Sequence, residues 1–379
     1  MTAPAPLAGV RIVDLSRILA GPFATQLLAD LGATVVKFEP PSGDPTRQWG
    51  PPFDDHGSAY YRCANRGKEC RVVDLGSESG RAEIDRELAD ADVVVENFRP
   101  GSASAVDFTP ERLRERFDRL IVASVRAFAS DVTGAARPGY DFLLQAESGW
   151  MAFTGEPDGR PMKVGVALVD VLAALYLANG IQAALRHRDQ TGVALHVEVP
   201  LMEAALAATV NVGAGVLMTG DAPTRHGVAH PNIVPYQSFP CRDGDVAIAV
   251  GNDRQFESLM LGLGLQDSLA EHPNWRTNPG RVDDRFRLVS LLSDSFATRT
   301  LAEALALGEA SGVACGPVRQ LDDVLLHQRG TLHDAVETMT TSEGTPVEVL
   351  RSPVLLDGER ACHPRPPSRD PTLEPPDPV

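Results

Sequence analysis

The chain has 379 residues, of which 51 are acidic and 35 basic, so its formal net charge is −16. Its hydrophobic content of 43% is typical of a globular protein, and its length is sufficient for two domains. A strongly negative field repels phosphate polymers, so we expect no nucleic-acid partner and no anionic membrane partner, although a local basic pocket for one small anion stays compatible with it.

The five cysteines are an odd number and are scattered, with no C-x-x-C pair. His226, His230 and Asp253 lack the spacing of a metal site. We therefore expect reduced thiols and no bound metal. The first six residues contain no charged and apolar signal regions, and no uninterrupted run of about 18 apolar residues occurs, so we expect a soluble protein of the cytoplasm.

The chain begins with a strand, a helix and a second strand. Residues 10–15 predict the first strand, residues 23–31 a helix closed by Gly32, and residues 34–38 the second strand. A glycine at the end of a helix adopts the left-handed conformation without strain, which supports this boundary. The pattern indicates a βαβ unit.

Two more short β-branched runs follow at residues 93–96 and 120–125, with a helical stretch at 110–117 between them. Strands that alternate with helices are typical of a mainly parallel sheet covered by helices. The predicted fold class is therefore α/β, with a Rossmann-like large domain.

A single carboxylate, Asp170, lies where the segment 163–170 runs into an apolar-periodic helix at 171–185. An aspartate at a helix start accepts backbone N–H bonds and experiences the positive end of the helix dipole, so its pKa should fall and it should stay ionised. These properties suit a helix cap and a nucleophile equally, and spacing alone leaves both interpretations open.

The second half predicts a different architecture. Residues 194–199 predict a strand and residues 201–218 a second apolar helix. Turn residues then become frequent from His226 onward, which indicates a smaller α+β domain. Its predicted elements are a strand at 246–250 and helices at 255–263, 282–298 and 301–310.

Other signatures of chemistry are incomplete or missing. Gly21-Pro22 follows the first strand, but the second and third glycines of a dinucleotide-binding G-x-G-x-x-G are absent, so a tight strand-to-helix turn is the better interpretation. No G-x-S-x-G sequence occurs, which removes the usual serine-hydrolase signal. Asp170 remains the leading candidate.

Eight further segments, together with the one around Asp170, resemble the family III CoA-transferases in order along nearly the whole chain. Each segment is a weak signal, but the ordered set is specific. The matching segments are residues 14–22, 31–37, 91–101, 138–142, 154–157, 230–236, 249–253 and 316–318.

The resemblance implies a fold in which both chain ends build a large Rossmann-like domain around a smaller α+β domain. It also implies that two subunits interlock as a homodimer. The expected boundaries are 1–200 for the first part of the large domain, 201–225 for a linker helix, 226–325 for the small domain, and 326–379 for a return segment with a proline-rich tail.

The resemblance also implies the reaction, which is transfer of CoA from an acyl-CoA to a small carboxylic acid. Asp170 aligns with the family's nucleophilic aspartate, which forms a mixed anhydride and then an aspartyl-CoA thioester. Covalent steps of this kind divide one difficult exchange into easier ones. Backbone N–H groups at the helix start would stabilise the oxyanions.

Residues around the cofactor follow from the same resemblance. Ile18, Leu19 and Ala20 would line the adenine and pantetheine path, Asn97 and Phe98 would hold the CoA chain, and Tyr140 would lie near the acyl group. The family's racemase branch usually has histidine where this chain has Tyr140, so transfer is favoured over racemisation. The implied CoA-binding residues are Ile18, Leu19, Ala20, Val73, Asn97, Phe98, Arg99 and Tyr140.

The sequence departs from the family at three positions that are commonly basic, where it has Glu69, Gly76 and Ala105. Fewer cationic groups would then contact the CoA phosphates, unless others compensate, namely Arg66, Lys68, Arg71 and Arg99. Two alternatives follow. One is a racemase, isomerase or divergent acyl transferase with reduced use of free CoA, and the other is a non-catalytic ligand-binding homologue. The donor and acceptor acids do not follow from the sequence.

Overall fold

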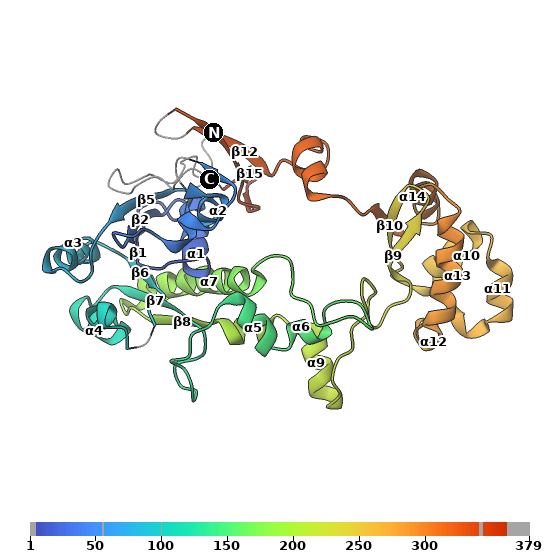
Figure 1. Ribbon diagram of the computed structural model, residues 1–379, viewed down its shortest axis with the longest axis horizontal. Helices are drawn as coiled ribbons and strands as arrows, with labels where there is room; N and C mark the ends of the chain where they lie inside the picture. The colour runs from blue at the N-terminus through green and yellow to red at the C-terminus, as the bar shows by residue number, and fades with distance from the viewer. Residues whose placement is uncertain (1–4, 55–56, 100, 341–343, 362–379) are drawn as a thin grey trace. The chain divides into compact units, whose positions relative to one another are not determined.

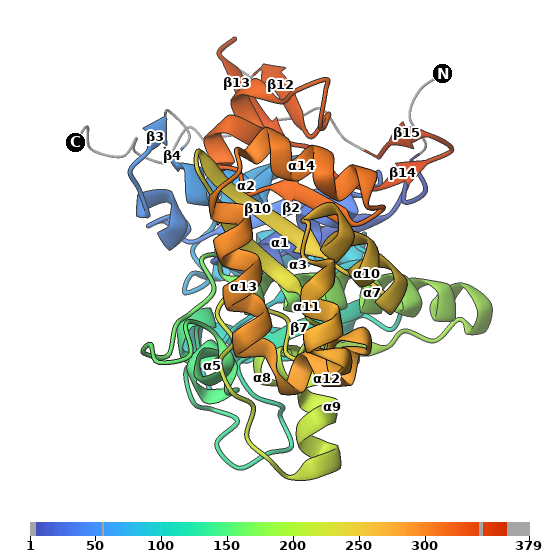
Figure 2. The ribbon, with the colours of Figure 1, turned by 90° about the vertical axis from the view of Figure 1, so that its right-hand side faces the viewer.

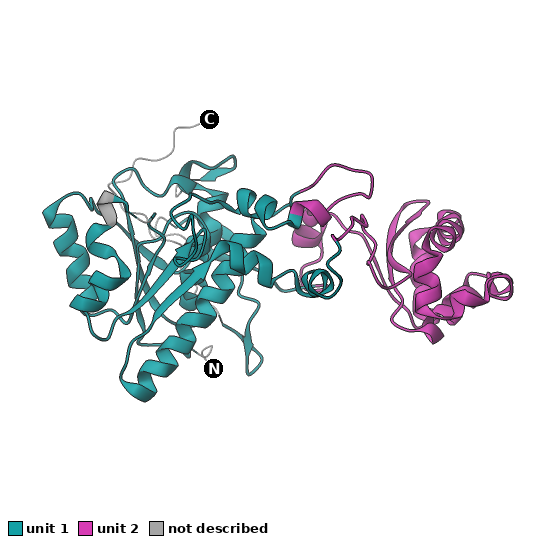
Figure 3. Cartoon of the chain, turned by 90° about the horizontal axis from the view of Figure 1, so that it is seen from below, with its two compact units in different colours: residues 1–150, 163–221, 333–379 teal, residues 151–162, 222–332 magenta. Residues whose placement is uncertain are grey.

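The structure is a computed structural model that describes residues 5–54, 57–99, 101–340 and 344–361. The proline-rich tail lies outside the described residues. The chain forms two compact units, which Figure 3 colours separately. Unit 1 consists of residues 1–150, 163–221 and 333–379, and unit 2 of residues 151–162 and 222–332.

Unit 1 is built on a six-stranded sheet in which every neighbouring pair of strands is parallel. Numbered in chain order within the sheet, the strands lie in the order 3-2-1-4-5-6, which is the Rossmann arrangement. The predicted α/β fold with a parallel sheet is confirmed. In spatial order the strands are β5 (Lys68–Val72), β2 (Thr34–Glu39), β1 (Arg11–Asp14), β6 (Val93–Glu96), β7 (Ile121–Arg126) and β8 (His196–Pro200).

Helices cover both faces of this sheet (Figure 1). Neighbouring strand residues point to opposite faces, so Ile12 and Val13 of β1 belong to different cores. The core around Ile12 contains α1 (Ala20–Asp30) and α7 (Leu168–Thr191). The core around Val13 contains residues of α3 (Glu78–Ala89) and α4 (Pro110–Arg116). Strands buried on both faces explain the continuous β-branched runs.

Helix α7 is long and apolar enough to cross a membrane by length and composition alone, and the bent pair α8 and α9 passes the same test when the two are taken together. In unit 1, however, Ala173, Leu177 and Ile181 of α7 are fully buried in the core that it shares with α1 and the sheet. Its apolar sequence therefore builds the core of unit 1. The helix ends at Gly192, whose φ of 77° is left-handed.

The prediction of one apolar helix over residues 201–218 is wrong in one respect, because two helices occupy this stretch. They are α8 (Leu201–Ala207) and α9 (Val210–Thr219), and they meet at an angle of 80°. Val210 has a φ of 41°, which interrupts the helical backbone. The hydroxyl of Thr209 donates to the carbonyl oxygen of Leu206 at 2.7 Å and closes the end of α8.

The remaining short elements of unit 1 surround the sheet or return to it late in the chain. Arg66 donates to the carbonyl oxygen of Leu350, which joins the return segment to the sheet region. These elements are β3 (Phe53–Asp54), β4 (Gly57–Ser58), α2 (Ala59–Asn65), α5 (Asp141–Glu147), β12 (Val336–Thr340), β13 (Pro346–Leu350), β14 (Leu355–Leu356) and β15 (Glu359–Arg360). The short helix α6 (Trp150–Phe153) begins at the boundary, and its last three residues belong to unit 2.

Unit 2 contains a three-stranded antiparallel sheet with helices packed on it, as predicted for an α+β block (Figure 2). The elements are β9 (Tyr236–Cys241), β10 (Gly244–Ala249), β11 (Ala314–Pro317), α10 (Asp253–Gly262), α11 (Gln266–Glu271), α12 (Asn278–Asp283), α13 (Arg285–Ala297) and α14 (Leu301–Ala310). The helix expected at 282–298 is confirmed as α13, which begins three residues later than predicted because the chain turns at Asp284 and residues 282–283 end the preceding helix α12.

Candidate active site

A cavity of about 390 Å³ opens in unit 1 at the carboxyl ends of β1, β6 and β7. In a sheet of this strand order, ligands bind where the order reverses, between the first and fourth strands, which are β1 and β6 here. The cavity brings together eight of the nine predicted site residues, from four separate parts of the chain. These eight are Ile18, Leu19, Ala20, Asn97, Phe98, Arg99, Tyr140 and Asp170.

Asp170 is the third residue of α7, and it is only 7% exposed. Ala167 is the residue at the helix N-cap, and no side chain caps the helix from that position. Burial, reinforced by the nearby carboxylate of Asp141, raises the pKa of Asp170 from 3.8 to about 7. The predicted capping role and lowered pKa of Asp170 are therefore wrong, because desolvation outweighs the helix dipole at this position.

The capping bond at this helix comes from Asp141, the first residue of α5. Its Oδ1 atom accepts a hydrogen bond from the backbone N–H of Val169 at 2.8 Å. Its Oδ2 atom accepts from the side chain of Gln145 at 2.7 Å, and Gln145 in turn accepts from the backbone N–H of Val164 at 2.8 Å. Helix α5 thus holds the segment that leads into Asp170.

The expectation that backbone N–H groups at the start of α7 serve as oxyanion donors is not met at its first two residues. The N–H of Leu168 donates to the carbonyl oxygen of Val166 at 2.9 Å, and the N–H of Val169 donates to Asp141. Both groups are therefore engaged within the protein. These two groups are therefore not available as oxyanion donors, which leaves the other N–H groups of this turn and the side chains of the site.

Tyr60, on α2, lies close enough to Asp170 to be affected by its charge, although it does not line the cavity, and the sequence reasoning missed it. Burial, followed by the negative charge of Asp170, raises the pKa of Tyr60 to about 12, so the phenol keeps its proton at neutral pH. Its ring meets that of Trp49 edge-on, with centroids 5.2 Å apart. The adjacent Tyr61 is buried and donates to Glu39 at 2.7 Å. Nothing in the local sequence distinguishes the two tyrosines.

Tyr140, in contrast, is 61% exposed and precedes the first turn of α5. It lines the cavity together with Asp170. Because a tyrosine occupies this position, no imidazole is present there to accept a proton from a carbon acid.

Four arginines line the cavity, and they differ in whether they are paired. Arg126 is paired with Glu96 at 2.6 Å, and Arg137 with Glu147 at 2.6 Å. Among the described residues, Arg17 and Arg99 form no ion pair. These two guanidinium groups give the cavity uncompensated positive charge, which suits an anionic ligand.

Three of the four basic residues expected to compensate for lost cationic positions are engaged elsewhere. The ammonium of Lys68 is buried and lies 3.0 Å from Asp14, and Arg66 is paired with Asp30. Arg71 contacts both Glu69 and Glu87 at 2.7 Å. Arg66 and Lys68 each belong to a buried ion pair with a structural role, so the expectation that they contact the CoA phosphates is wrong for both. Arg99 alone of the four lines the cavity.

Val73, the ninth predicted residue, lines a smaller neighbouring pocket of about 150 Å³. Arg17 and Phe98 line both spaces, so the two pockets adjoin. The walls of the smaller pocket are mostly apolar and come from the ends of β1, β2 and β5, together with the first part of α3. They include Leu15, Phe38, Pro40, Leu75 and Ile84.

No group of three histidine, cysteine, aspartate or glutamate side chains within the described ranges is arranged to hold a metal ion. The side chains that line the cavity include one carboxylate, Asp170, one tyrosine, Tyr140, and four arginines. A buried carboxylate that shares a cavity with a tyrosine and with two guanidinium groups free of ion pairs among the described residues is suited to covalent reaction with an acyl group on an anionic carrier.

The sequence profile of a family described as CoA-transferase family III matches residues 7–374. The succinate–glutarate CoA-transferase of Agrobacterium fabrum is 36% identical over 95% of this chain and 92% of its own length. The succinyl-CoA:mesaconate CoA-transferase of Haloarcula hispanica is 35% identical over 94% of each chain. A crystal structure of a CAIB/BAIF family protein from Brucella suis is 38% identical, with a TM-score of 0.84 over 98% of this chain and 97% of that one.

Proposed function

The chain belongs to CoA-transferase family III, and from that membership we propose that it transfers CoA between two small dicarboxylic acids through covalent intermediates on Asp170. Its general activity is that of an acyl-CoA:carboxylate CoA-transferase. The observation that carries the proposal is the buried Asp170 carboxylate in a cavity with two arginines that form no ion pair among the described residues.

The dicarboxylate class is supported by two independent features. The names of the two relatives above contain succinate, glutarate and mesaconate, each of which has a second carboxylate. The cavity offers Arg17 and Arg99, which form no ion pair within the described part of the chain. We propose that one of them binds the distal carboxylate of the acid, and that the other faces the CoA phosphates.

The proposed reaction begins when a carboxylate oxygen of Asp170 attacks the thioester carbonyl of the donor. The C–S bond breaks, which leaves an aspartyl mixed anhydride and CoA thiolate. The thiolate then attacks the aspartyl carbonyl, releases the donor as a free carboxylate, and forms an aspartyl-CoA thioester. No water enters these steps, so the energy of the thioester bond is retained.

The second half of the reaction repeats these steps in reverse with the acceptor. A carboxylate oxygen of the acceptor attacks the aspartyl thioester, which expels CoA thiolate and forms a second anhydride. The thiolate attacks the acceptor's carbonyl, which gives the new acyl-CoA and restores the Asp170 carboxylate. We propose that the hydroxyl of Tyr60 or Tyr140 donates to the oxyanion that forms at each attack.

The raised pKa of Asp170 supports its proposed role in two ways. Its pKa of about 7 leaves both the ionised and the protonated form present near neutral pH, so a nucleophilic carboxylate is available there. Burial also removes water from the carboxylate, which makes it more basic and more nucleophilic than an exposed aspartate. The same exclusion of water protects the anhydride and thioester intermediates from hydrolysis.

We propose that CoA extends from the larger cavity into the smaller pocket. Residues Ile18 to Ala20 and Asn97 to Arg99 would follow its pantetheine chain, and the apolar pocket at Val73 would accept the adenine. Arg17 and Phe98 line both spaces, so one ligand is able to pass between them. The mostly apolar walls suit an aromatic base.

We propose that the active protein is a homodimer of interlocked subunits. Helix α9 has no buried residue, and its Leu217 and Met218 are 90% and 86% exposed. An apolar helix without a covering surface is typical of a protein interface. A second copy of this chain would bury it.

We also propose that the enzyme works in the cytoplasm. Cys63, Cys70, Cys241 and Cys315 are free thiols, and the fold uses no disulfide among its described residues. A reducing compartment keeps thiols in this state. Separation of cytoplasmic, periplasmic and membrane fractions with an antibody against the chain would test this location.

The covalent mechanism is tested by trapping. The protein is incubated with succinyl-CoA and hydroxylamine, digested, and mapped by mass spectrometry. We expect a hydroxamate on Asp170, formed only when the thioester is present. Absence of any adduct on Asp170 across a panel of dicarboxylic acyl-CoA esters would contradict the mechanism. Asp170→Ala should give no adduct and should keep the melting temperature within a few degrees.

A further inference from the structure

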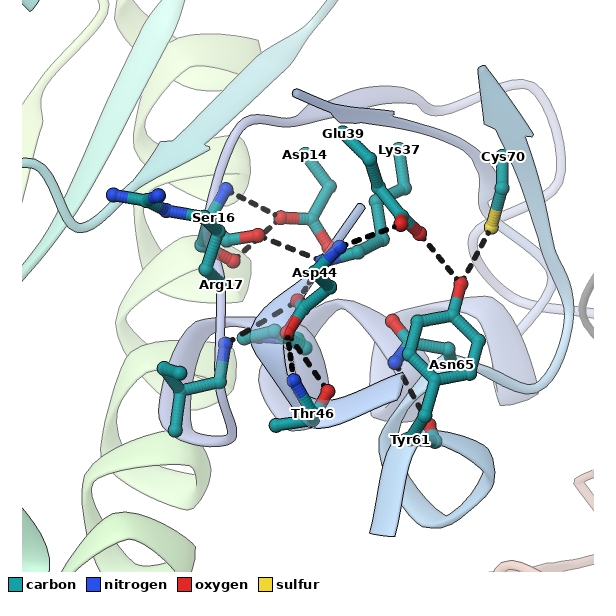
Figure 4. A network of polar contacts seen from close by, with 12 residues as sticks. Asp14, Ser16, Arg17, Lys37, Glu39, Asp44, Thr46, Tyr61, Asn65 and Cys70 are labelled. Carbon is teal, nitrogen blue, oxygen red and sulfur yellow. Dashed lines mark hydrogen bonds and ion pairs between the residues drawn. The ribbon is translucent and has the colours of Figure 1, made fainter. Parts of the chain in front are cut away.

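In the loop between β1 and α1, the backbone of each residue from Ser16 to Ile18 forms a hydrogen bond with a polar side chain. These side chains come from β1 and from other parts of unit 1. The side chain of Asp14 accepts a hydrogen bond from the backbone N–H of Ser16 at 2.9 Å. The ammonium of Lys37 donates to the carbonyl oxygen of Ser16 at 2.7 Å. This loop leads directly into the cavity wall at Arg17 to Ala20. Figure 4 shows these contacts around the loop.

Arg17 is clamped on both sides of its peptide backbone by one side chain. The Oδ1 atom of Asn97 accepts from the N–H of Arg17 at 3.0 Å, and its Nδ2 atom donates to the carbonyl oxygen at 2.7 Å. The side-chain amide of Asn97 is therefore engaged with the loop. It fixes the backbone from which the Arg17 side chain reaches the cavity wall.

Ile18 has a φ of 72°, which is a left-handed conformation that a β-branched residue rarely adopts. Such strain persists only where the surroundings over-determine it. The carboxylate of Asp44 supplies one constraint, because its Oδ2 atom accepts from the backbone N–H of Ile18 at 3.3 Å. The start of α1 supplies another, since a Cβ atom at Gly21 would lie 2.3 Å from the Oγ atom of Ser16.

Asp44 is itself fixed from three directions. Its Oδ2 atom lies 3.1 Å from the ammonium of Lys37, and neither of the two side chains is exposed. Its Oδ1 atom accepts from the backbone N–H of Thr46 at 3.0 Å and from the hydroxyl of Thr46 at 2.7 Å. A buried charge costs free energy unless it is paired, so this arrangement has little freedom to relax.

Charge is balanced within the buried group that surrounds the loop. Lys68 bridges Asp14 at 3.0 Å and the carbonyl oxygen of Pro22, in the first turn of α1, at 2.7 Å. Burial disfavours ionisation of Asp14, but Lys68 and Lys37 outweigh burial and hold its pKa far below the usual value. The ion pairs Asp14–Lys68 and Asp44–Lys37 thus connect the two ends of the loop.

We infer that Asp44 is a positioning residue for CoA thioester binding, because it holds Ile18 in its strained conformation and so presets the cavity wall formed by Arg17 to Ala20. This inference rests on the proposed function, since CoA is the ligand that the wall would contact. Asp44 does not line the cavity itself. Its effect on binding is therefore transmitted through the backbone of Ile18.

A double-mutant cycle between Asp44 and Ile18 tests the inference. The full-length protein and the variants Asp44→Asn, Ile18→Gly and the double variant are titrated with CoA by calorimetry, and KM and kcat are measured with succinyl-CoA. Asparagine keeps only one oxygen, which the two Thr46 donors would retain, so its amide group would face the N–H of Ile18. We therefore expect Asp44→Asn to raise the Kd for CoA and the KM about tenfold, with kcat changed less than about threefold. Glycine adopts a φ of 72° without strain, so in the Ile18→Gly protein the same change should raise Kd only about twofold.

Thr46→Val is the matched control, because it removes a hydrogen bond to the other oxygen of the same carboxylate. We expect its Kd for CoA to stay within about threefold of the unmodified protein, even where its melting temperature falls. An equal rise in Kd for Asp44→Asn in both backgrounds would overturn the inference, because it would mean that Asp44 acts on the fold generally. If the unmodified protein does not bind CoA, the proposed function itself fails, and the inference fails with it.

Discussion

Asp141 accepts a hydrogen bond from the backbone N–H of Val169 at 2.8 Å, and so it provides the capping contact that the sequence assigns to Asp170. The two carboxylates therefore have different tasks at one helix start. Asp141 satisfies the helix and places a negative charge near the site, whereas Asp170 is buried and is not the capping residue. Together, burial and the charge of Asp141 account for the raised pKa of Asp170.

Replacing Asp141 with asparagine should lower the pKa of Asp170. The amide oxygen of the new side chain would still accept the N–H of Val169, but the neighbouring negative charge would be gone. We expect the midpoint of adduct formation, near pH 7 in the unmodified protein, to move about half a unit or more to lower pH. Single-turnover rates with succinyl-CoA between about pH 5 and 9 would measure it. Asp189→Asn, at the other end of α7, is the control, and an unchanged or higher midpoint for Asp141→Asn would contradict the prediction.

Asp170→Asn should abolish transfer and should stabilise the fold increasingly as the pH rises. Folding raises the pKa of Asp170 from 3.8 to about 7, so the protonated group favours the folded state. That contribution is complete below about pH 4 and is lost as the pH passes about 7. Asparagine never ionises, so its advantage in the free energy of unfolding should grow by about 3 kcal/mol between about pH 5 and pH 8. Urea titrations at both pH values would test the sign, and an advantage that shrinks with pH would refute it.

The sequence predicted five of the six strands of the sheet, most clearly β1, β2, β6 and β7, which are largely buried and read as runs of β-branched residues. It did not predict β5, whose five residues include three charged ones. It did not predict that α8 and α9 are separate, because the apolar pattern continues through the break at Thr209 and Val210. Nor could it predict the state of Asp170. Helix position suggested a low pKa, but the pKa depends on burial and on Asp141, 29 positions earlier in the chain. Such proximity is created only by the tertiary fold.

Tyr60→Phe should slow the chemical steps with little effect on stability. The hydroxyl of Tyr60 keeps its proton, because its pKa is about 12, and so it is able to donate to an oxyanion beside Asp170. We expect kcat to fall about tenfold or more, with KM for succinyl-CoA nearly unchanged. Tyr61→Phe is the matched control, because its hydroxyl lies in the buried network with Glu39. That variant should lose about 1–2 kcal/mol of stability and keep its kcat. The reverse pattern would exclude Tyr60 as the donor.

Arg17→Gln should weaken binding of acceptors that carry a second carboxylate. Arg17 lines the cavity and has no ion-pair partner among the described residues. We expect KM for glutarate to rise about tenfold or more, while KM for butyrate, which lacks the distal carboxylate, stays within about twofold. Arg137→Gln is the control, because Glu147 already pairs with that guanidinium. Equal increases for glutarate and butyrate would indicate that Arg17 contacts CoA and not the acceptor.

Leu217→Asp should weaken the proposed homodimer. Leu217 is 90% exposed on α9, a helix with no buried residue, and a charge placed there would have to be desolvated if a second subunit covered it. We expect the dissociation constant of the dimer to be about a hundredfold higher than that of the unmodified protein, as measured by analytical ultracentrifugation. Leu217→Met keeps the side chain apolar and should behave as the unmodified protein. An unchanged dimer in Leu217→Asp would mean that α9 lies outside the interface, and a monomeric unmodified protein would contradict the homodimer itself.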